Sequence, residues 1–193
     1  AESGITRKST SIGYAKRVIE SYSAKSAQNI TVFSGKASPE YLTYQLAKQT
    51  QDYGNAHTAI PVSELVTFFG RERYTMAMPG LLTDLYDAPE TLRLPGTFRH
   101  GELNLRNVYI TFLSASTPSW LYGAINPSVV EGGFTSRVII CNERLPKRRV
   151  AWPEDKNYGE TPEDLAEYLG ELVEFVQRRG EIPLTAKAKR KFV

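Results

Sequence analysis

Lys8 and Ser9 are the residues whose types and positions best fit a known chemistry, the binding of phosphate. They follow a stretch of small residues and stand at the start of a helical pattern. A phosphate-binding loop uses backbone N–H groups to hold an anion, a lysine to reach the β- and γ-phosphates, and a hydroxyl to bind Mg²⁺. The pattern therefore predicts a site for phosphate groups and Mg²⁺. Its cofactor-binding residues would be Gly4, Thr6, Arg7, Lys8, Ser9 and Thr10. The alternative is a basic, solvated helix start without a ligand.

Glu64 is a carboxylate at the end of the second predicted strand, residues 57–64. In ATPases with a phosphate-binding loop, a carboxylate at such a place orients the attacking water or helps to hold Mg²⁺. Glu64 is therefore the candidate for the catalytic carboxylate and, with Ser9, for the metal site. The alternative is that Glu64 is a favourable charge at a helix N-terminus.

Small hydroxyl residues cluster where the strongest predicted strand, residues 107–114, comes to its end. Ligands of open α/β sheets bind at the carboxyl ends of the strands. Ser116 and Thr117 are therefore candidates for contacting the terminal phosphate of a nucleotide. The alternative is a Ser/Thr turn that caps a helix beginning at Pro118.

Arg137 follows two glycines, Gly132 and Gly133, and precedes an apolar run at residues 138–142 that predicts a strand. Glycine permits a tight turn, and an arginine at a loop–strand junction can stabilise charge on a phosphoryl group during transfer. Arg137 is therefore the second predicted catalytic residue, acting in its own subunit or in a neighbour. The alternative is a surface arginine after a flexible turn.

Helical and strand patterns alternate along the chain. Helices are predicted at residues 9–24, 65–71, 78–86 and 161–179, and another begins at the Ser38-Pro39 cap. Strands are predicted at residues 29–35, 57–64, 107–114 and 138–142, with Pro61 marking an edge or a bulge. Residues 91–105 predict a small β-hairpin insertion. This order predicts an α/β fold with a mainly parallel sheet and helices on both faces.

The composition is that of an ordinary globular chain. Its 193 residues are 41% hydrophobic and 23% charged, which suits one domain with its own core and excludes intrinsic disorder. No apolar run is long enough to span a membrane. The single cysteine, Cys141, excludes an internal disulfide and a cysteine-based zinc cluster, so we expect a cytoplasmic protein. The net charge of +3 does not by itself indicate nucleic-acid binding.

Both ends of the chain look interrupted. The first residues already lie in the predicted loop, and the last residues lie in a basic helical pattern. We therefore expect one domain, residues 1–193, cut from a longer protein at both ends, with helices in residues 161–193. A short mature protein with a processed N-terminus is the alternative.

Taken in order, these segments resemble an otherwise uncharacterised family of P-loop, RecA-like ATPase domains. The family occurs in phage, prophage and plasmid proteins, is often fused to or encoded beside a primase, and is presumed to be helicase-like. The resemblance covers nearly the whole chain. It rests on GITRKST at residues 4–10, VFSGKASPEYL at 32–42, SE at 63–64, LTDLYDAP at 82–89, SASTP at 114–118, GGFTSR at 132–137 and LTAKA at 184–188.

The resemblance implies a P-loop NTPase fold and a role in phage or mobile-element DNA replication, in the bacterial or phage-infected host cytosol. By this resemblance, Lys8 and the loop backbone would hold the phosphates of ATP, and Ser9 would bind Mg²⁺. Glu64 would polarise the attacking water, and Ser116 or Thr117 would contact the γ-phosphate.

The resemblance also implies partners. Arg137 would act as an arginine finger across a subunit interface in a homo-oligomeric ring. Single-stranded or duplex DNA would be the nucleic-acid partner, and a primase would be a further domain or partner. No membrane is implied.

The sequence departs from the pattern at two places. Ser63 stands where the family usually has an aspartate, which leaves Mg²⁺ to Ser9, phosphate oxygens and water. Glu2 and Arg7 stand where a consensus phosphate loop has glycine. A non-hydrolysing P-loop module that binds DNA or serves as an assembly scaffold is therefore the main alternative. An ATPase of the same fold that drives DNA packaging or defence is another.

Overall fold

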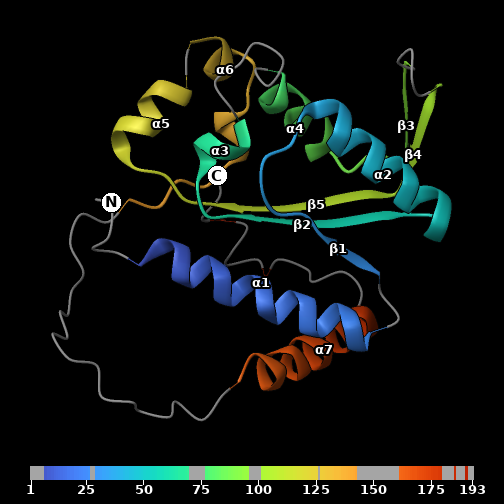
Figure 1. Ribbon diagram of the computed structural model, residues 1–193. Coiled ribbons are helices and arrows are strands. Elements are labelled where there is room, and N and C mark those ends of the chain that lie inside the picture. Colours follow the sequence, from blue (N-terminus) through green and yellow to red (C-terminus); the bar gives the residue numbers. More distant parts are fainter. Residues whose placement is uncertain are drawn as a thin grey trace, which may run out of the picture.

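Three parallel strands form the central sheet of the protein (Figure 1). They are β1 (Ile30–Val32), β2 (Ala56–Val62) and β5 (Val108–Ser114), in the spatial order β1-β2-β5. The computed structural model describes residues 7–26, 29–69, 77–95, 101–125, 127–142 and 161–179, together with residues 185 and 190. The predicted mixed α/β fold with a parallel sheet is confirmed for these strands.

Helices lie on both faces of the sheet (Figure 1). One side carries α2 (Pro39–Tyr53), α3 (Leu65–Phe69), α4 (Met78–Tyr86), α5 (Pro118–Ala124), α6 (Pro127–Glu131) and the 3-10 turn η2 (Thr135–Arg137). On the other side, α1 (Lys8–Lys25) contacts β1 and β2, and α7 (Pro162–Arg179) packs along α1. Within the described ranges, no helix is long and apolar enough to cross a membrane.

Aromatic rings form the centre of the core, between the sheet and the helices α2 to α4. The fully buried Phe68 of α3 has its ring centroid 5.5 Å from that of Phe112 in β5 and 6.5 Å from that of Phe33. Aliphatic side chains of α2 and β2 complete this core, namely Leu42, Leu46, Ile60 and Val62. Burial of a large side chain contributes about 1.5–3 kcal/mol. Phe68 therefore fixes α3 against the last part of β5.

Helix α2 begins and ends as its sequence predicts. Ser38 Oγ accepts a hydrogen bond from the Tyr41 N–H at 3.2 Å, and Pro39 occupies the first turn. Gly54 ends the helix with a φ of 77°, a conformation that glycine adopts without strain. Local sequence signals are sufficient to place this helix.

Helix α7 begins with a reciprocal cap between Thr161 and Asp164. The Asp164 N–H donates to Thr161 Oγ1 at 3.2 Å, and the Thr161 N–H donates to Asp164 Oδ2 at 2.8 Å. The backbone and side-chain hydrogen bonds from Thr161 hold the pKa of Asp164 below its ordinary value. This stabilisation is complete above the ordinary aspartate pKa and is lost as the pH falls through the lowered pKa.

Pro61 lies in β2, which is the middle strand of the sheet and not an edge strand. The Val62 carbonyl bonds toward β5, whereas the Ala59 carbonyl accepts from the Phe33 N–H on the β1 side. Because backbone groups alternate sides along a strand, the nitrogen of Pro61 also faces the β1 side. Strand β1 ends opposite Ala59, so Pro61 removes no ladder hydrogen bond. The prediction that Pro61 marks an edge strand is wrong. Its physical reason still holds, because the nitrogen of Pro61 faces a side on which no described strand pairs with it.

The predicted hairpin insertion is confirmed as the antiparallel pair β3 (Thr91–Leu94) and β4 (Leu103–Arg106). It packs on α2 through the buried Leu105. The Arg106 N–H donates to Thr50 Oγ1 at 3.2 Å, which gives the buried threonine a partner. The hairpin thus closes the end of the molecule away from the carboxyl ends of β2 and β5 (Figure 1).

The predicted strand at residues 138–142 is wrong, because these residues belong to no strand in the structure. Ile139 is 95% exposed and Ile140 is 55% exposed. An apolar, β-branched run forms a strand only where a neighbouring strand pairs with it, and none of the described strands does so here. Residues 70–71 of one predicted helix, Gly96 of the hairpin and most of residues 180–193 lie outside the described residues.

We expect Phe68→Ala to lower the free energy of unfolding by about 3–5 kcal/mol, because it removes a fully buried ring and leaves a cavity beside Phe112. Urea unfolding followed by circular dichroism measures the change. Tyr122→Ala is the matched control, since Tyr122 is 82% exposed and its loss should change stability by less than about 0.5 kcal/mol. Equal effects of the two substitutions would contradict this description of the core.

Candidate functional site

The carboxyl ends of β2 and β5 are joined by backbone hydrogen bonds. The Ala115 N–H donates to the Val62 carbonyl at 3.3 Å, and the Leu65 N–H donates to the Ala115 carbonyl at 2.8 Å. Residues 63–64 after β2 and residues 115–117 after β5 therefore leave the sheet side by side. This is the edge of a parallel sheet at which ligands bind in open α/β folds.

Helix α1 begins at the same edge. Lys8 Nζ donates a hydrogen bond to the Ser116 carbonyl at 2.9 Å, in a partly buried contact between residues 108 positions apart. The predicted phosphate-loop lysine and the predicted phosphate-contacting segment are therefore neighbours in space. Neither pattern alone predicts this contact.

The N-terminus of α1 presents features that suit an anion. Arg7 is the N-cap residue and makes no side-chain cap hydrogen bond, and the first turn contains no acidic residue. Ser9 and Thr10 are exposed in that turn. The first backbone N–H groups of a helix have no partner within the helix, and the helix dipole adds partial positive charge there. Lys8 adds a full positive charge.

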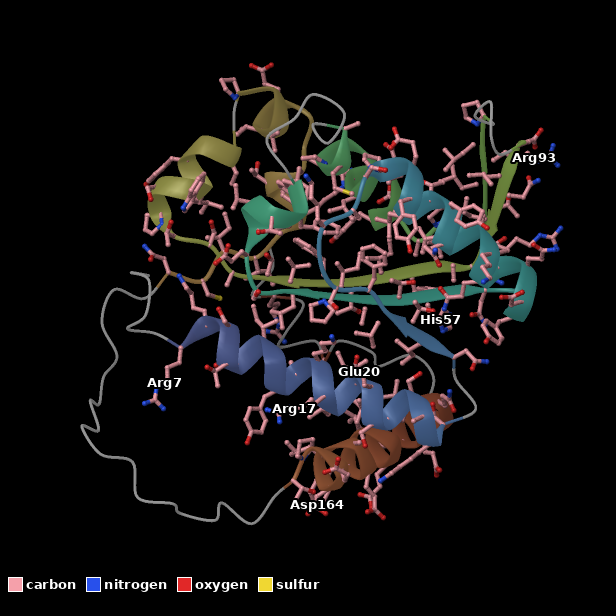
Figure 2. The ribbon with its side chains drawn as sticks, viewed as in Figure 1. Arg7, Arg17, Glu20, His57, Arg93 and Asp164 are labelled. Atoms are coloured by element: carbon pink, nitrogen blue, oxygen red, sulfur yellow. The ribbon has the colours of Figure 1, made fainter. Side chains whose placement is uncertain are left out.

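Arg7 adopts a left-handed conformation, with φ 46° and ψ 32°. A consensus phosphate loop has glycine at this position, because the backbone turns there with positive φ. Arg7 thus takes the backbone shape that the glycine would take, and at a steric cost. In Figure 2 its side chain points away from the sheet at the start of α1.

Glu64 is exposed between β2 and α3, as is Ser63 before it. Thr67 Oγ1 lies 3.5 Å from Glu64 Oε2, and the Thr67 N–H donates to the Glu64 carbonyl at 3.1 Å. These contacts agree with a charge at the start of α3. They leave the carboxylate at the carboxyl edge of the sheet, where water can reach it.

Thr117 caps α5, since its Oγ1 accepts from the Trp120 N–H at 3.4 Å. This is the Ser/Thr cap that the sequence offered as an alternative. Ser116 Oγ donates to the Thr117 carbonyl at 3.2 Å. Ser114 Oγ, at the end of β5, is buried and has no partner among the described atoms.

Arg137 lies in η2 and is held by its own loop. Its Nη1 donates to the Gly133 carbonyl at 3.1 Å, and its guanidinium carbon lies 5.5 Å from the centroid of the Tyr86 ring. A Cβ atom at Gly133, which has a φ of 79°, would lie 2.7 Å from Arg137 Nη1. The side chain of Arg137 thus contacts Gly133 and Tyr86, neither of which the sequence predicts at the site.

The residues at this edge fit a Mg²⁺–nucleotide in their donor types. Lys8 and the first N–H groups of α1 can hold phosphate oxygens, and the Ser9 hydroxyl and Glu64 carboxylate are oxygen ligands of the kind that Mg²⁺ prefers. In the described part of the chain, no group of three His, Cys, Asp or Glu residues lies close enough to hold a metal. Gly4 and Thr6 of the predicted loop lie outside the described residues.

No protein-family model, no curated protein and no solved structure matches the chain.

Two features of the site are not visible in the sequence, and a third is. Ala115 joins the two strand exits through its backbone, which any residue could do. Tyr86 lies under Arg137 although 51 positions separate them, and no local pattern connects the pair. The left-handed backbone conformation of Arg7 could have been predicted, because a consensus phosphate loop has glycine at this position.

We expect Arg7→Gly to be more stable than Arg7→Ala by about 1 kcal/mol, measured by urea unfolding. An L-residue in the left-handed region costs about 1–2 kcal/mol, part of which the greater freedom of glycine in the unfolded chain offsets. Both variants lose the same charge, so their difference isolates the backbone. Equal stability of the two variants would show that residue 7 does not carry this strain in solution.

Proposed function

We propose that this chain is an ATP-binding and ATP-hydrolysing domain with a P-loop, RecA-like fold. The observation that carries the proposal is the hydrogen bond from Lys8 Nζ to the Ser116 carbonyl at 2.9 Å, which sets the start of α1 at the carboxyl ends of β2 and β5. A lysine, the N-terminal N–H groups of a helix, a hydroxyl and a carboxylate then lie at one edge of a parallel sheet.

In this proposal, Lys8 exchanges the Ser116 carbonyl for an oxygen of the β- or γ-phosphate. The first N–H groups of α1 hold the remaining phosphate oxygens, and the Ser9 hydroxyl contributes a ligand to the metal. Mg²⁺ bound with ATP supplies charge neutralisation on the phosphates. Ser116 or Thr117 contacts the γ-phosphate, which gives the end of β5 a means to distinguish ATP from ADP.

Glu64 is the proposed catalytic carboxylate. It orients a water molecule toward the γ-phosphorus and accepts a hydrogen bond from that water, while the bond from the γ-phosphorus to the leaving oxygen of ADP breaks. The proton of the water leaves with the inorganic phosphate or passes to solvent. Glu64 must release its contact with Thr67 to do this, and that contact, at 3.5 Å, is at the limit of hydrogen-bond length.

Arg137 is the proposed arginine finger. Since its present contacts are with Gly133 and Tyr86, it would act after leaving them, on a nucleotide bound to a neighbouring subunit of a ring. Its Nε is buried without a hydrogen-bond partner among the described residues, which lowers the cost of such a change.

The biological setting follows from the resemblance and is proposed with it. The domain would act as a helicase-like motor of a phage or mobile-element DNA replication protein, on single-stranded or duplex DNA and beside a primase. Binding of this kind weakens steeply with added salt, because phosphate contacts release counterions.

A second candidate is a P-loop module that binds nucleotide or DNA without hydrolysis. Ser63 in place of an acidic residue and the Glu64–Thr67 contact favour it, since both reduce the carboxylate oxygens available to a metal and a water. An ATPase for DNA packaging or defence would have the same site. ATP binding without turnover, in the presence of single-stranded DNA, would favour the non-hydrolysing module.

We expect Lys8→Ala to weaken ATP binding by about 10- to 100-fold, because it removes a charged hydrogen-bond donor from the phosphates. Isothermal titration with ATP and Mg²⁺ measures the affinity. Lys16→Ala is the matched control on the same helix, since Lys16 contacts Glu20 and Ser34 and should leave binding unchanged. Unchanged affinity in Lys8→Ala would overturn the nucleotide site.

We expect Glu64→Gln to retain ATP binding and to lower turnover by about 100-fold or more, because the amide cannot orient and activate the water as the carboxylate does. Phosphate release measures turnover, with and without single-stranded DNA. Glu40→Gln is the control, since Glu40 is an exposed carboxylate in the first turn of α2. Full turnover in Glu64→Gln would remove Glu64 from the catalytic role.

A further inference from the structure

A stripe of exposed apolar side chains runs along α7. Tyr168, Leu172 and Val176 are each more than half exposed, and their spacing of four residues places them on one side of the helix. Phe175 is also more than half exposed, and it lies three residues from Leu172, which widens the stripe. Exposed apolar side chains that lie next to one another indicate a surface that binds another molecule.

The opposite side of α7 packs on α1. Ala166 is buried, and a Cβ atom at Gly170 would lie 3.7 Å from Tyr22 Cε2 of α1. Two positions along a helix turn a side chain by about 200°, so Ala166 faces away from Tyr168. Figure 1 shows α7 farther from the sheet than α1. Helix α7 is therefore apolar on two sides, and α1 covers one of them.

The charges of α7 are separated along its length. Glu163, Glu167 and Glu171 are exposed and lie four residues apart, where like charges repel one another. The last two residues of the helix are Arg178 and Arg179. A second α7 in the antiparallel direction sets the basic end of each helix beside the acidic half of the other, whereas a parallel one would set like charges together. The charge pattern therefore fits a second copy of this chain, with its α7 antiparallel.

We propose that the stripe binds the same stripe of a second copy, with the two α7 helices antiparallel about a two-fold axis near Leu172. Tyr168 and Val176 both lie four residues from Leu172, so each Tyr168 meets Val176 of the partner subunit. A large ring then faces a smaller aliphatic side chain on both sides of the axis. A contact of this kind is self-complementary and closes at two copies.

This contact is separate from the candidate nucleotide site. Helix α7 meets α1 at Tyr22, fourteen residues after Lys8, which is about 21 Å along the helix. Arg137 lies in η2, on the other face of the sheet (Figure 1). The proposal therefore rests neither on ATP chemistry nor on a ring. Failure of the Lys8 and Glu64 experiments would leave it unchanged, and its own failure would leave the ATP site to be judged by ATP binding.

Cysteine cross-linking in the full-length chain tests both the partner and the register. The native cysteines, Cys141 included, are first replaced by serine. We expect Leu172→Cys to form a disulfide-linked dimer on mild oxidation, because the two-fold axis places residue 172 next to its counterpart. Tyr168→Cys is the matched control, since both positions are 57% exposed but residue 168 lies at least about 12 Å from its counterpart in this register. The double variant Tyr168→Cys/Val176→Cys should cross-link again.

Two results of this experiment would overturn the proposal. Equal cross-linking of Leu172→Cys and Tyr168→Cys would indicate a parallel pair or random collision. The lack of a cross-link in every variant would mean that another part of the chain, or a different protein, covers the stripe.

Sedimentation of the chain with its native cysteines provides a second readout. We expect Tyr168→Glu to weaken self-association by at least about 10-fold, because the contact would strip water from the new carboxylate. Tyr122→Glu is the matched control, since Tyr122 is exposed on α5, on the other face of the sheet, and should leave the association unchanged. Equal association of the two variants, or an unsubstituted chain that stays a single copy at every concentration, contradicts the proposal.

Discussion

The parallel pairing of β2 with β5 is the constraint on which the other features depend. Its register runs from Ala56 opposite Val108 to Val62 opposite Ser114. A slip of one residue would turn Phe112 away from Phe68 and would point Leu113 into the core. It would also separate the two strand exits that Ala115 joins, and with them the carbonyl that Lys8 contacts. The aromatic core and the candidate site are thus consequences of one register.

How much the sequence predicts depends on how local the signal is. The caps at Ser38 and Thr161 lie within three residues of their partners, so the local sequence is sufficient to predict where α2 and α7 begin. The run at residues 138–142 has strand composition, but a strand also needs a neighbour, which composition cannot supply. The Lys8–Ser116 contact joins residues 108 positions apart. Sequence patterns identify such residues as candidates, but only the folded structure shows that they are in contact.

Some of the candidate site residues have ordinary structural roles, and these roles are compatible with a chemical role. Thr117 caps α5, and Glu64 contacts the start of α3, as ordinary helix-terminal residues do. Both nevertheless lie at the carboxyl edge of a parallel sheet. Lys8 distinguishes a structural role from a chemical one. A lysine at a solvated, basic helix start has no need to be partly buried, whereas the ammonium group of Lys8 is partly buried against the carbonyl of Ser116. That position sets a positive charge at the carboxyl edge of the sheet.

Helix α1 connects the candidate site to the architecture of the sheet. It is attached at both ends, by Lys8 to the exit of β5 and by Ser23 to the first residue of β1. A helix so attached carries the chain from one side of the sheet to the other. The start of α1 therefore lies at the carboxyl end of β5. A helix N-terminus at the carboxyl edge of a parallel sheet is a place where α/β folds bind phosphate, and the proposed ATP site depends on this position of α1.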